Sequence, residues 1–293
     1  MPPAGYISVL YMVGMALAPV SGVAMTKDVS LEGSSNWLVN WAEHSCVLAR
    51  KFGTADAPMW LSMRTYSPSY HFEITIAGKA VSQLQPPKSF TIAYGAGSPI
   101  EVRRYQVGRI AEYGPALIFS GEMAASDSDD SDEDGHDARL YPDAPFEAQL
   151  DRIELMTPYR KLVFNTGPMK RALDSLRQCT DNLVKGWGLD PAVQSSLSSR
   201  VKAENIRTWA QKIQASYPLE LLSQNKEARV NVLVIVDEHG MPKNCDTWQA
   251  FDNTDFKVRA CGIILRDARF TPAKDKDGRV TASYYTTVIV YRS

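Results

Sequence analysis

The chain has 293 residues, of which 44% are hydrophobic and 22% charged, as expected for a folded protein rather than a disordered one. The formal net charge of -1 at pH 7 gives no reason to expect binding to nucleic acid or to an acidic membrane surface. The length allows one large domain or two medium ones.

Residues 1–24 are predicted to be a secretory signal peptide. Tyr6 to Val20 is apolar and uncharged, and residues 22–24 have the small side chains usual at a cleavage site. The stretch is also long enough for an uncleaved membrane anchor of roughly 18 residues, which is the alternative. Pro19, Gly22 and the polar residues that follow favour cleavage.

Residues 30–190 are predicted to form a β-rich domain closed by a helix. From Trp37 to Met123, short alternating or apolar runs are bounded by Gly and Pro, which is typical of a sandwich or barrel. Two further strands are expected in 148–156 and 160–167. After residue 168 the period becomes helical, with apolar residues at Met169, Leu173, Leu176, Cys179 and Leu183.

An acidic run interrupts this domain. Seven acidic residues and no Lys or Arg lie between Asp127 and Asp137. The run contains DSDEDG, the first half of an EF-hand loop, but Tyr141 occupies the position of the bidentate glutamate. We therefore expect residues 124–138 to be a disordered loop and not a calcium site.

The C-terminal third begins with a predicted linker and amphipathic helix in 191–215, with Ile206, Trp209 and Ile213 on one helical face. From 216 to 293 we expect a strand, a turn, a return strand, a helix and a long alternating final strand. Asp275 to Gly278 is predicted to be a tight turn before that strand, with Gly278 supplying a positive φ.

The four cysteines are Cys46, Cys179, Cys245 and Cys261. None forms a Cys-x-x-Cys pair or has a standard zinc spacing to a histidine, so no metal site is predicted. Isolated cysteines in an exported chain favour disulfides, and three pairings are possible. We favour Cys245 with Cys261, because both fall in one compact segment, which leaves Cys46 with Cys179. Buried free thiols are the alternative if the chain is not exported.

No catalytic motif is recognisable. There is no Gly-x-Ser-x-Gly, phosphate-binding loop or His-Glu-x-x-His, and the histidines are scattered. Trp187, Trp209 and the Tyr284-Tyr285 pair fit core positions better than a nucleic-acid platform, because no basic residues interleave with them. We expect a binding protein without a cofactor, not an enzyme. A small-ligand binder or an enzyme using an interdomain cleft is the alternative.

The last quarter of the chain contains a distinctive series of segments. In chain order they are Tyr217-Pro218, VNVLVIVDEHGMPKN from Val230, Phe256, LRDARFTPA from Leu265 and DGRVTASYYTTVIVY from Asp277. In this order and spacing they resemble the C-terminal domain of TonB, the periplasmic energy-transducing protein of Gram-negative bacteria. Ala268 stands where TonB usually has Trp, and the Pro-rich spacer of TonB proteins is missing.

The resemblance implies a two-domain α+β protein whose C-terminal domain has helices on one face of a small antiparallel sheet. It also implies a protein-binding module in the periplasm that captures a segment of an outer-membrane transporter, or of another periplasmic protein, by adding it as a strand to a sheet edge. In this chain the edge would lie in the final strand, at Val280, Thr281, Ala282, Ser283, Tyr284, Tyr285, Thr286, Thr287 and Val288.

Two alternatives to this function stay open. The N-terminal domain could cover the edge, since exposed edges promote aggregation. If the first 24 residues stay uncleaved, the chain could instead be a membrane-anchored component of TonB-dependent transport.

Overall fold

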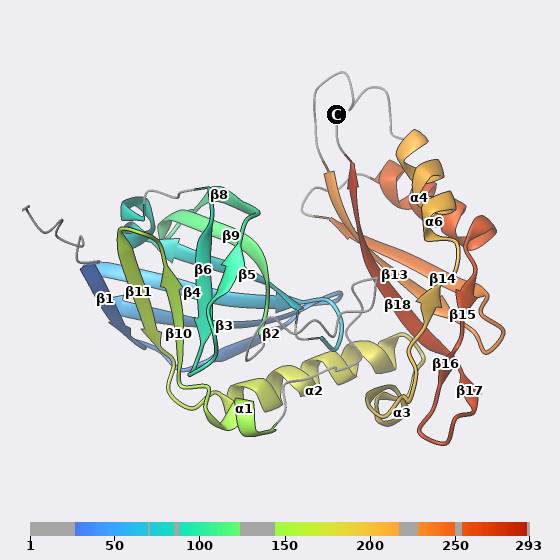
Figure 1. Ribbon diagram of the computed structural model, residues 1–293, viewed down its shortest axis with the longest axis horizontal. Coiled ribbons are helices and arrows are strands. Elements are labelled where there is room, and N and C mark those ends of the chain that lie inside the picture. The colour runs from blue at the N-terminus through green and yellow to red at the C-terminus, as the bar shows by residue number, and fades with distance from the viewer. Residues whose placement is uncertain are drawn as a thin grey trace, which may run out of the picture.

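The computed structural model describes residues 27–69, 71–84, 88–123, 144–216, 228–249 and 254–291. The predicted signal peptide and the acidic run lie outside these residues. In the described part of the chain, no helix is long and apolar enough to span a membrane. Figure 1 shows a β-rich N-terminal unit (residues 27–188) and a smaller C-terminal unit (residues 191–291), connected along α2 (Lys170–Gly186).

Two sheets build the N-terminal unit. One has six antiparallel strands, and the other has five, with only β1 and β11 parallel. In spatial order the first sheet contains β2 (Leu38–Trp41), β3 (Cys46–Thr54), β4 (Ala57–Thr65), β5 (His71–Gly78), β9 (Gly114–Glu122) and β8 (Tyr105–Ile110). The second contains β1 (Lys27–Glu32), β11 (Arg160–Asn165), β10 (Arg152–Met156), β6 (Phe90–Tyr94) and β7 (Ile100–Val102).

Alternation of apolar and polar residues explains how these sheets pack. In β5, Phe72, Ile74 and Ile76 are buried, whereas Glu73 and Thr75 between them are partly exposed. Side chains from both sheets and from α2 share one core. The short helices η1 (Lys79–Gln83) and α1 (Ala144–Ala148) complete the unit.

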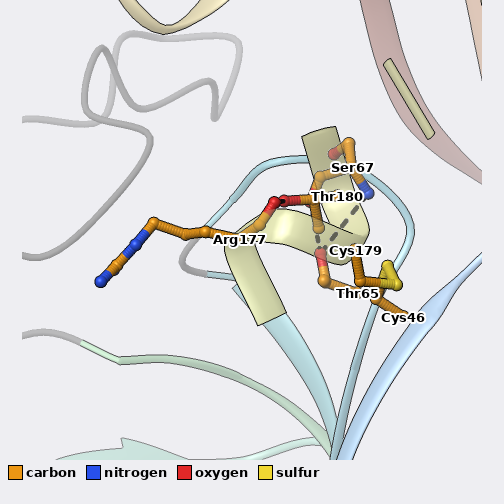
Figure 2. Close-up of a disulfide and its surroundings, with 6 residues drawn as sticks. All are labelled: Cys46, Thr65, Ser67, Arg177, Cys179 and Thr180. Atoms are coloured by element: carbon orange, nitrogen blue, oxygen red, sulfur yellow. Dashed lines mark hydrogen bonds between the residues drawn. A yellow bond between two sulfur atoms is a disulfide. The ribbon is translucent and has the colours of Figure 1, made fainter. Parts of the chain in front are cut away.

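The predicted closing helix is α2, and a disulfide holds it in place. Cys179 on its buried face is bonded to Cys46 at the start of β3, with Cα atoms 6.0 Å apart. Figure 2 shows this disulfide beside the turn that follows β4, in which Thr65 Oγ1 donates a 2.6 Å hydrogen bond to Ser67 O. The disulfide thus holds the middle of α2 at the start of β3, where Cys46 pairs with Thr65 at the end of β4.

A three-stranded antiparallel sheet forms the centre of the C-terminal unit, in the order β14 (Pro242–Gln249), β13 (Ala228–Val236), β18 (Ser283–Tyr291). The helices α4 (Ile206–Ala215) and α6 (Thr254–Asp267) cover one face (Figure 1). The core below them contains Trp209, Ile213, Ala260 and Ile264 with alternate residues of β13 and β18. A second disulfide joins Cys245 in β14 to Cys261 in α6. The α+β prediction is confirmed, with N-terminal β-sheets, a long helix and a C-terminal antiparallel sheet with helices, and both favoured cysteine pairings are present.

The segment predicted as a linker is built into the C-terminal unit. It contains α3 (Pro191–Ser195) and β12 (Lys202–Ala203), and β12 pairs with β15 (Phe270–Thr271). Leu197, Val201 and Ala203 pack in the C-terminal core. Asp190 explains the start of α3, because its carboxylate accepts from Ala192 N at 2.9 Å and Pro191 follows it.

The predicted turn at Asp275–Gly278 is confirmed. It joins β16 (Ala273–Lys274) to β17 (Val280–Thr281), with Gly278 at φ 79°. Asp275 Oδ1 accepts from the backbone N atoms of Asp277 and Arg279, each at 2.9 Å. Asp275 thus stabilises the turn, and Asp277 Oδ2 accepts from the Arg279 guanidinium at 2.9 Å.

The final strand differs from the prediction in one respect. A single strand was expected, but β17 ends at Thr281 and β18 starts at Ser283. Ala282 lies between them, and its carbonyl accepts a 3.0 Å hydrogen bond from Gln194 Nε2. A glutamine of α3 therefore occupies an acceptor that could otherwise pair with another strand.

Candidate protein-binding edge

The last strand, β18, lies at the outside of the C-terminal sheet. It pairs with β13 on one side, and in the described residues no strand pairs with its other side. The pairing runs from Val236 opposite Ser283 to Ala228 opposite Tyr291. One side of β18 is thus the position at which a further strand could add.

The alternation of backbone groups along β13 shows which residues of β18 have N–H and C=O groups that point to the outer side. Asp237, directly after β13, donates from its N atom to Met241 O at 3.0 Å, on the β14 side. The backbone N–H and C=O groups of successive residues point alternately to the two neighbouring strands. In β13 those of the odd-numbered residues therefore point to β14, and those of the even-numbered residues point to β18. Their partners, Ser283, Tyr285, Thr287 and Ile289, therefore exchange hydrogen bonds with β13. Tyr284, Thr286, Val288 and Val290 point outward.

Two side-chain hydrogen bonds agree with this assignment. Gln214 Nε2 donates to Val290 O at 2.8 Å, and Gln194 Nε2 donates to Ala282 O at 3.0 Å. Both acceptors are even-numbered residues, whose carbonyls are expected on the outer side. The backbone of Thr286 and Val288, midway between the two glutamines, is the part of the edge most suited to pairing.

The side chains of β18 divide between two environments. Ser283, Tyr285 and Ile289 are buried on the face under the helices. On the opposite face Tyr284 is also buried, but Val288 and Val290 are 39% and 37% exposed. An added strand would thus meet apolar side chains at the Val288 end of the edge.

The N-terminal unit contacts the Tyr284 end of this second face. The Tyr284 hydroxyl donates to Pro68 O at 3.5 Å, and its ring packs against Trp187 just after α2. Trp248 of β14 lies next to His44 and Tyr66, with ring centroids 5.4 Å and 6.0 Å away. These residues form the interdomain cluster together with Val184 and Leu233. It covers part of the sheet face and leaves Val288 and Val290 exposed.

The structure places the predicted site residues in two groups. Ser283 to Val288 lie in β18. Val280 and Thr281 instead pair with Lys274 and Ala273 in the β16–β17 hairpin. Ala282 joins the two groups. Gln194, Gln214, Trp187 and Trp248 were missed as contributors to this region. Only Gln194 had a local signal, because Asp190-Pro191 is typical of a helix start.

Charged groups support the sheet from a distance and do not lie on β18. Ser283 to Tyr291 contains no Asp, Glu, Lys, Arg or His. Hydrogen bonds from Arg266 and from Lys212 of α4 hold the pKa of Asp267, at the end of α6, well below its ordinary value. The pKa of Asp237 is also lowered, first by the backbone N–H of Met241. These carboxylates fix α4 on α6 and the β13–β14 turn.

No group of three or more His, Cys, Asp or Glu that could hold a metal ion occurs among the described residues. All four cysteines are used in disulfides. The candidate site is therefore an uncharged backbone edge with exposed apolar side chains at one end.

Residues 213–292 match the family model described as Gram-negative bacterial TonB protein C-terminal. They form a TonB C-terminal domain. No curated protein matches the chain. The TonB C-terminal domain contains β13, β14, α6 and β18, whereas Gln194, Trp187 and the N-terminal unit lie outside the matched residues. The domain implies a protein interaction related to TonB-dependent transport, and it fits an extracytoplasmic protein together with the two disulfides.

Proposed function

We propose that the protein is exported to the periplasm and binds an outer-membrane transporter, or another periplasmic protein, by β-strand addition to β18. The observation that carries the proposal is the position of β18 at the edge of the TonB C-terminal domain, with the backbone of Thr286 and Val288 pointing outward. Main-chain hydrogen bonds would supply affinity, and alternate side chains would set the register.

Two features of the edge support recognition through the backbone. The strand has no charged side chain that could form an ion pair with a partner. Val288 and Val290 offer partly exposed apolar surface beside the outward-facing groups. Binding is thus expected to depend weakly on salt concentration, because screening acts mainly on charge pairs.

Capture from a Gram-negative envelope extract tests this function. The baits are the wild-type chain, Thr286→Pro and Thr286→Val. Proline removes an outward-facing N–H, whereas valine keeps the backbone and the β-branched shape. We expect wild type and Thr286→Val to retain the same outer-membrane or periplasmic protein and Thr286→Pro to lose it. Equal capture by all three folded proteins would exclude β18 as the recognition edge.

A second candidate function is that of a membrane-anchored component of TonB-dependent transport, because the apolar segment Tyr6 to Val20 is long enough to serve as an anchor. Sequencing the mature N-terminus distinguishes the two. A start near Met25 supports the exported protein, whereas an intact Met1 in the membrane fraction supports the anchored one.

A further inference from the structure

We infer that Gln194, upstream of the TonB C-terminal domain, ends the binding edge firmly at Ala282, while Gln214 marks a weaker end at Val290, so that about five residues of the edge lie between them. This inference rests on strand addition at β18. Gln194 would thus set the register and the length of the bound segment, although it lies outside the TonB C-terminal domain that provides β18.

The Gln194 side chain is buried and fully engaged by the start of β18. It is 2% exposed, its Nε2 donates to Ala282 O at 3.0 Å, and its Oε1 accepts from Ser283 Oγ at 2.5 Å. Ala282 O is the next outward-facing acceptor beyond Tyr284, by the alternation along the strand. A bound segment that extended past Tyr284 would have to displace a buried amide and leave its polar atoms without partners, which is costly.

The short helix that carries Gln194 is tied down at both ends. Directly before the helix, Leu189 packs against the interdomain cluster, and its N atom donates to Val184 O at 3.2 Å. Beyond the helix, Ser198 N donates to Lys274 O at 2.9 Å, and Lys274 N donates to Ser199 O at 2.8 Å. Gln194 is thus held between the interdomain cluster and the β16–β17 hairpin and acts as a fixed stop.

Gln214 provides a softer stop at the other end. It lies on α4, and its Nε2 donates to Val290 O at 2.8 Å in an exposed position. Since water can replace this hydrogen bond, a segment that reaches Val290 meets little resistance. The edge is therefore closed firmly at Ala282 and weakly at Val290.

The space between the stops defines the partner chemistry. Tyr284 to Val288 can accept an extended segment of about five residues, because both strands rise about 3.3 Å per residue. On the face away from the helices, the residue opposite Val288 would lie beside the partly exposed Val288 and Val290. The segment should thus be short and uncharged, with an apolar side chain at that end.

Synthetic peptides test the inference with the full mature chain. The probes are a five-residue peptide of alternating Val and Thr and a nine-residue peptide extended by two residues at each end. Their dissociation constants are measured for wild type, Gln194→Ala, Gln194→Met and Gln214→Ala. For each protein we take the ratio of the two dissociation constants and compare this ratio between variants. A longer alternating peptide can bind in more registers, and this advantage cancels because it is the same for every variant.

For Gln194→Ala we expect the affinity of the nine-residue peptide to rise roughly fivefold for each hydrogen bond added at the freed end. The affinity of the five-residue peptide should be unchanged. Gln194→Met removes the hydrogen bonds but keeps the bulk, so its ratio should lie between those of wild type and Gln194→Ala. A smaller gain is expected for Gln214→Ala. Circular dichroism confirms that each variant is folded.

Two negative outcomes are distinguishable. If the peptides bind and Thr286→Pro abolishes binding, but wild type and Gln194→Ala give the same ratio, strand addition stands and the role of Gln194 is wrong. If neither peptide binds wild type or any variant, strand addition at this edge is wrong, and the inference fails with it.

Discussion

The ring of Tyr284 meets the ring of Trp187 edge to face, with centroids 5.0 Å apart and planes inclined by 60°. Tyr284 belongs to the last strand of the TonB C-terminal domain, and Trp187 follows the helix that closes the N-terminal unit. The backbone of Tyr284 points to the binding edge, while its side chain helps to join the two units. A strand bound at this edge would therefore contact a residue that the N-terminal unit holds in place.

Replacing Trp187 by alanine should loosen the two units. The change removes the partner of Tyr284 from the interdomain cluster and should cost about 2 kcal/mol, less than for a fully buried tryptophan because Trp187 is partly exposed. Small-angle scattering should show a larger radius of gyration. The matched control is Trp60→Ala, which removes a ring stacked on Tyr113 within the N-terminal unit and should leave the radius unchanged. An unchanged radius for Trp187→Ala would mean that other contacts hold the units together.

Adjacent prolines in β18 should differ in their effect on stability. Thr287 exchanges hydrogen bonds with Val232 of β13, so Thr287→Pro removes a bond inside the sheet and should cost more than about 2 kcal/mol. Thr286 faces outward, and Thr286→Pro should cost under about 1 kcal/mol. Urea unfolding measures both values. Since proline imposes the same φ at each position, the difference isolates the lost N–H. The reverse order would show that the alternation is shifted by one residue.

Removal of the two disulfides should have unequal consequences. The Cys46–Cys179 bond links residues 133 positions apart, and the Cys245–Cys261 bond links residues 16 apart. In the chain-entropy model these loops contribute about 5 and about 3 kcal/mol. Replacing each pair by alanine and measuring unfolding should therefore destabilise the first variant more. Alkylation of the unreduced wild-type protein should label no cysteine, and two or more labelled cysteines would contradict the assigned bonds.

Stability at low pH should depend on Asp267. Its carboxylate is bound by Arg266 and Lys212, which keep its pKa in the folded protein below the ordinary 3.8. A carboxyl group with a lowered pKa stabilises the fold above its unfolded-state pKa, and this contribution is lost as the pH falls through the folded-state value. Asp267→Asn should therefore be less stable at neutral pH and lose less stability between about pH 5 and pH 2.

Lys212→Met keeps the Asp267 carboxylate and removes one of its partners, so it should change the acid profile in the same direction but less. Thermal unfolding at stepped pH values gives the profiles. Parallel curves for wild type and Asp267→Asn would show that this carboxylate is not the group that titrates.

Deletion of Ser126 to Asp137 should leave stability within about 1 kcal/mol, because a highly charged polar segment buries little apolar surface. The melting temperature measures the effect. A decrease of more than about ten degrees would indicate that the acidic run packs or binds an ion. Calorimetry with millimolar calcium should show no heat of binding, and heat that disappears when Asp130 and Asp132 are changed to Asn would contradict the prediction.

Local patterns in the sequence were sufficient for most elements. Alternation in HFEITIAG predicts a strand, and the spacing of Leu173, Leu176 and Leu183 predicts the closing helix, because each side chain takes its face from the period of its own segment. Asp275 and Gly278 define their turn through the adjacent backbone alone. The order of the last elements was enough to indicate the TonB C-terminal domain.

The extent of the binding edge was decided only by the tertiary structure. Gln194 and Ala282 are 88 residues apart, and their hydrogen bond exists because α3 packs beside the last strand. The serine-rich segment around Gln194 has weak local periodicity, so its sequence suggested a linker. Likewise, Trp248 and Tyr284 have the alternation of ordinary strand residues, and only the folded chain shows that they join the two units. Sequence periodicity reports which face of an element is buried, whereas the residues that bury it are set by contacts between segments distant in the chain.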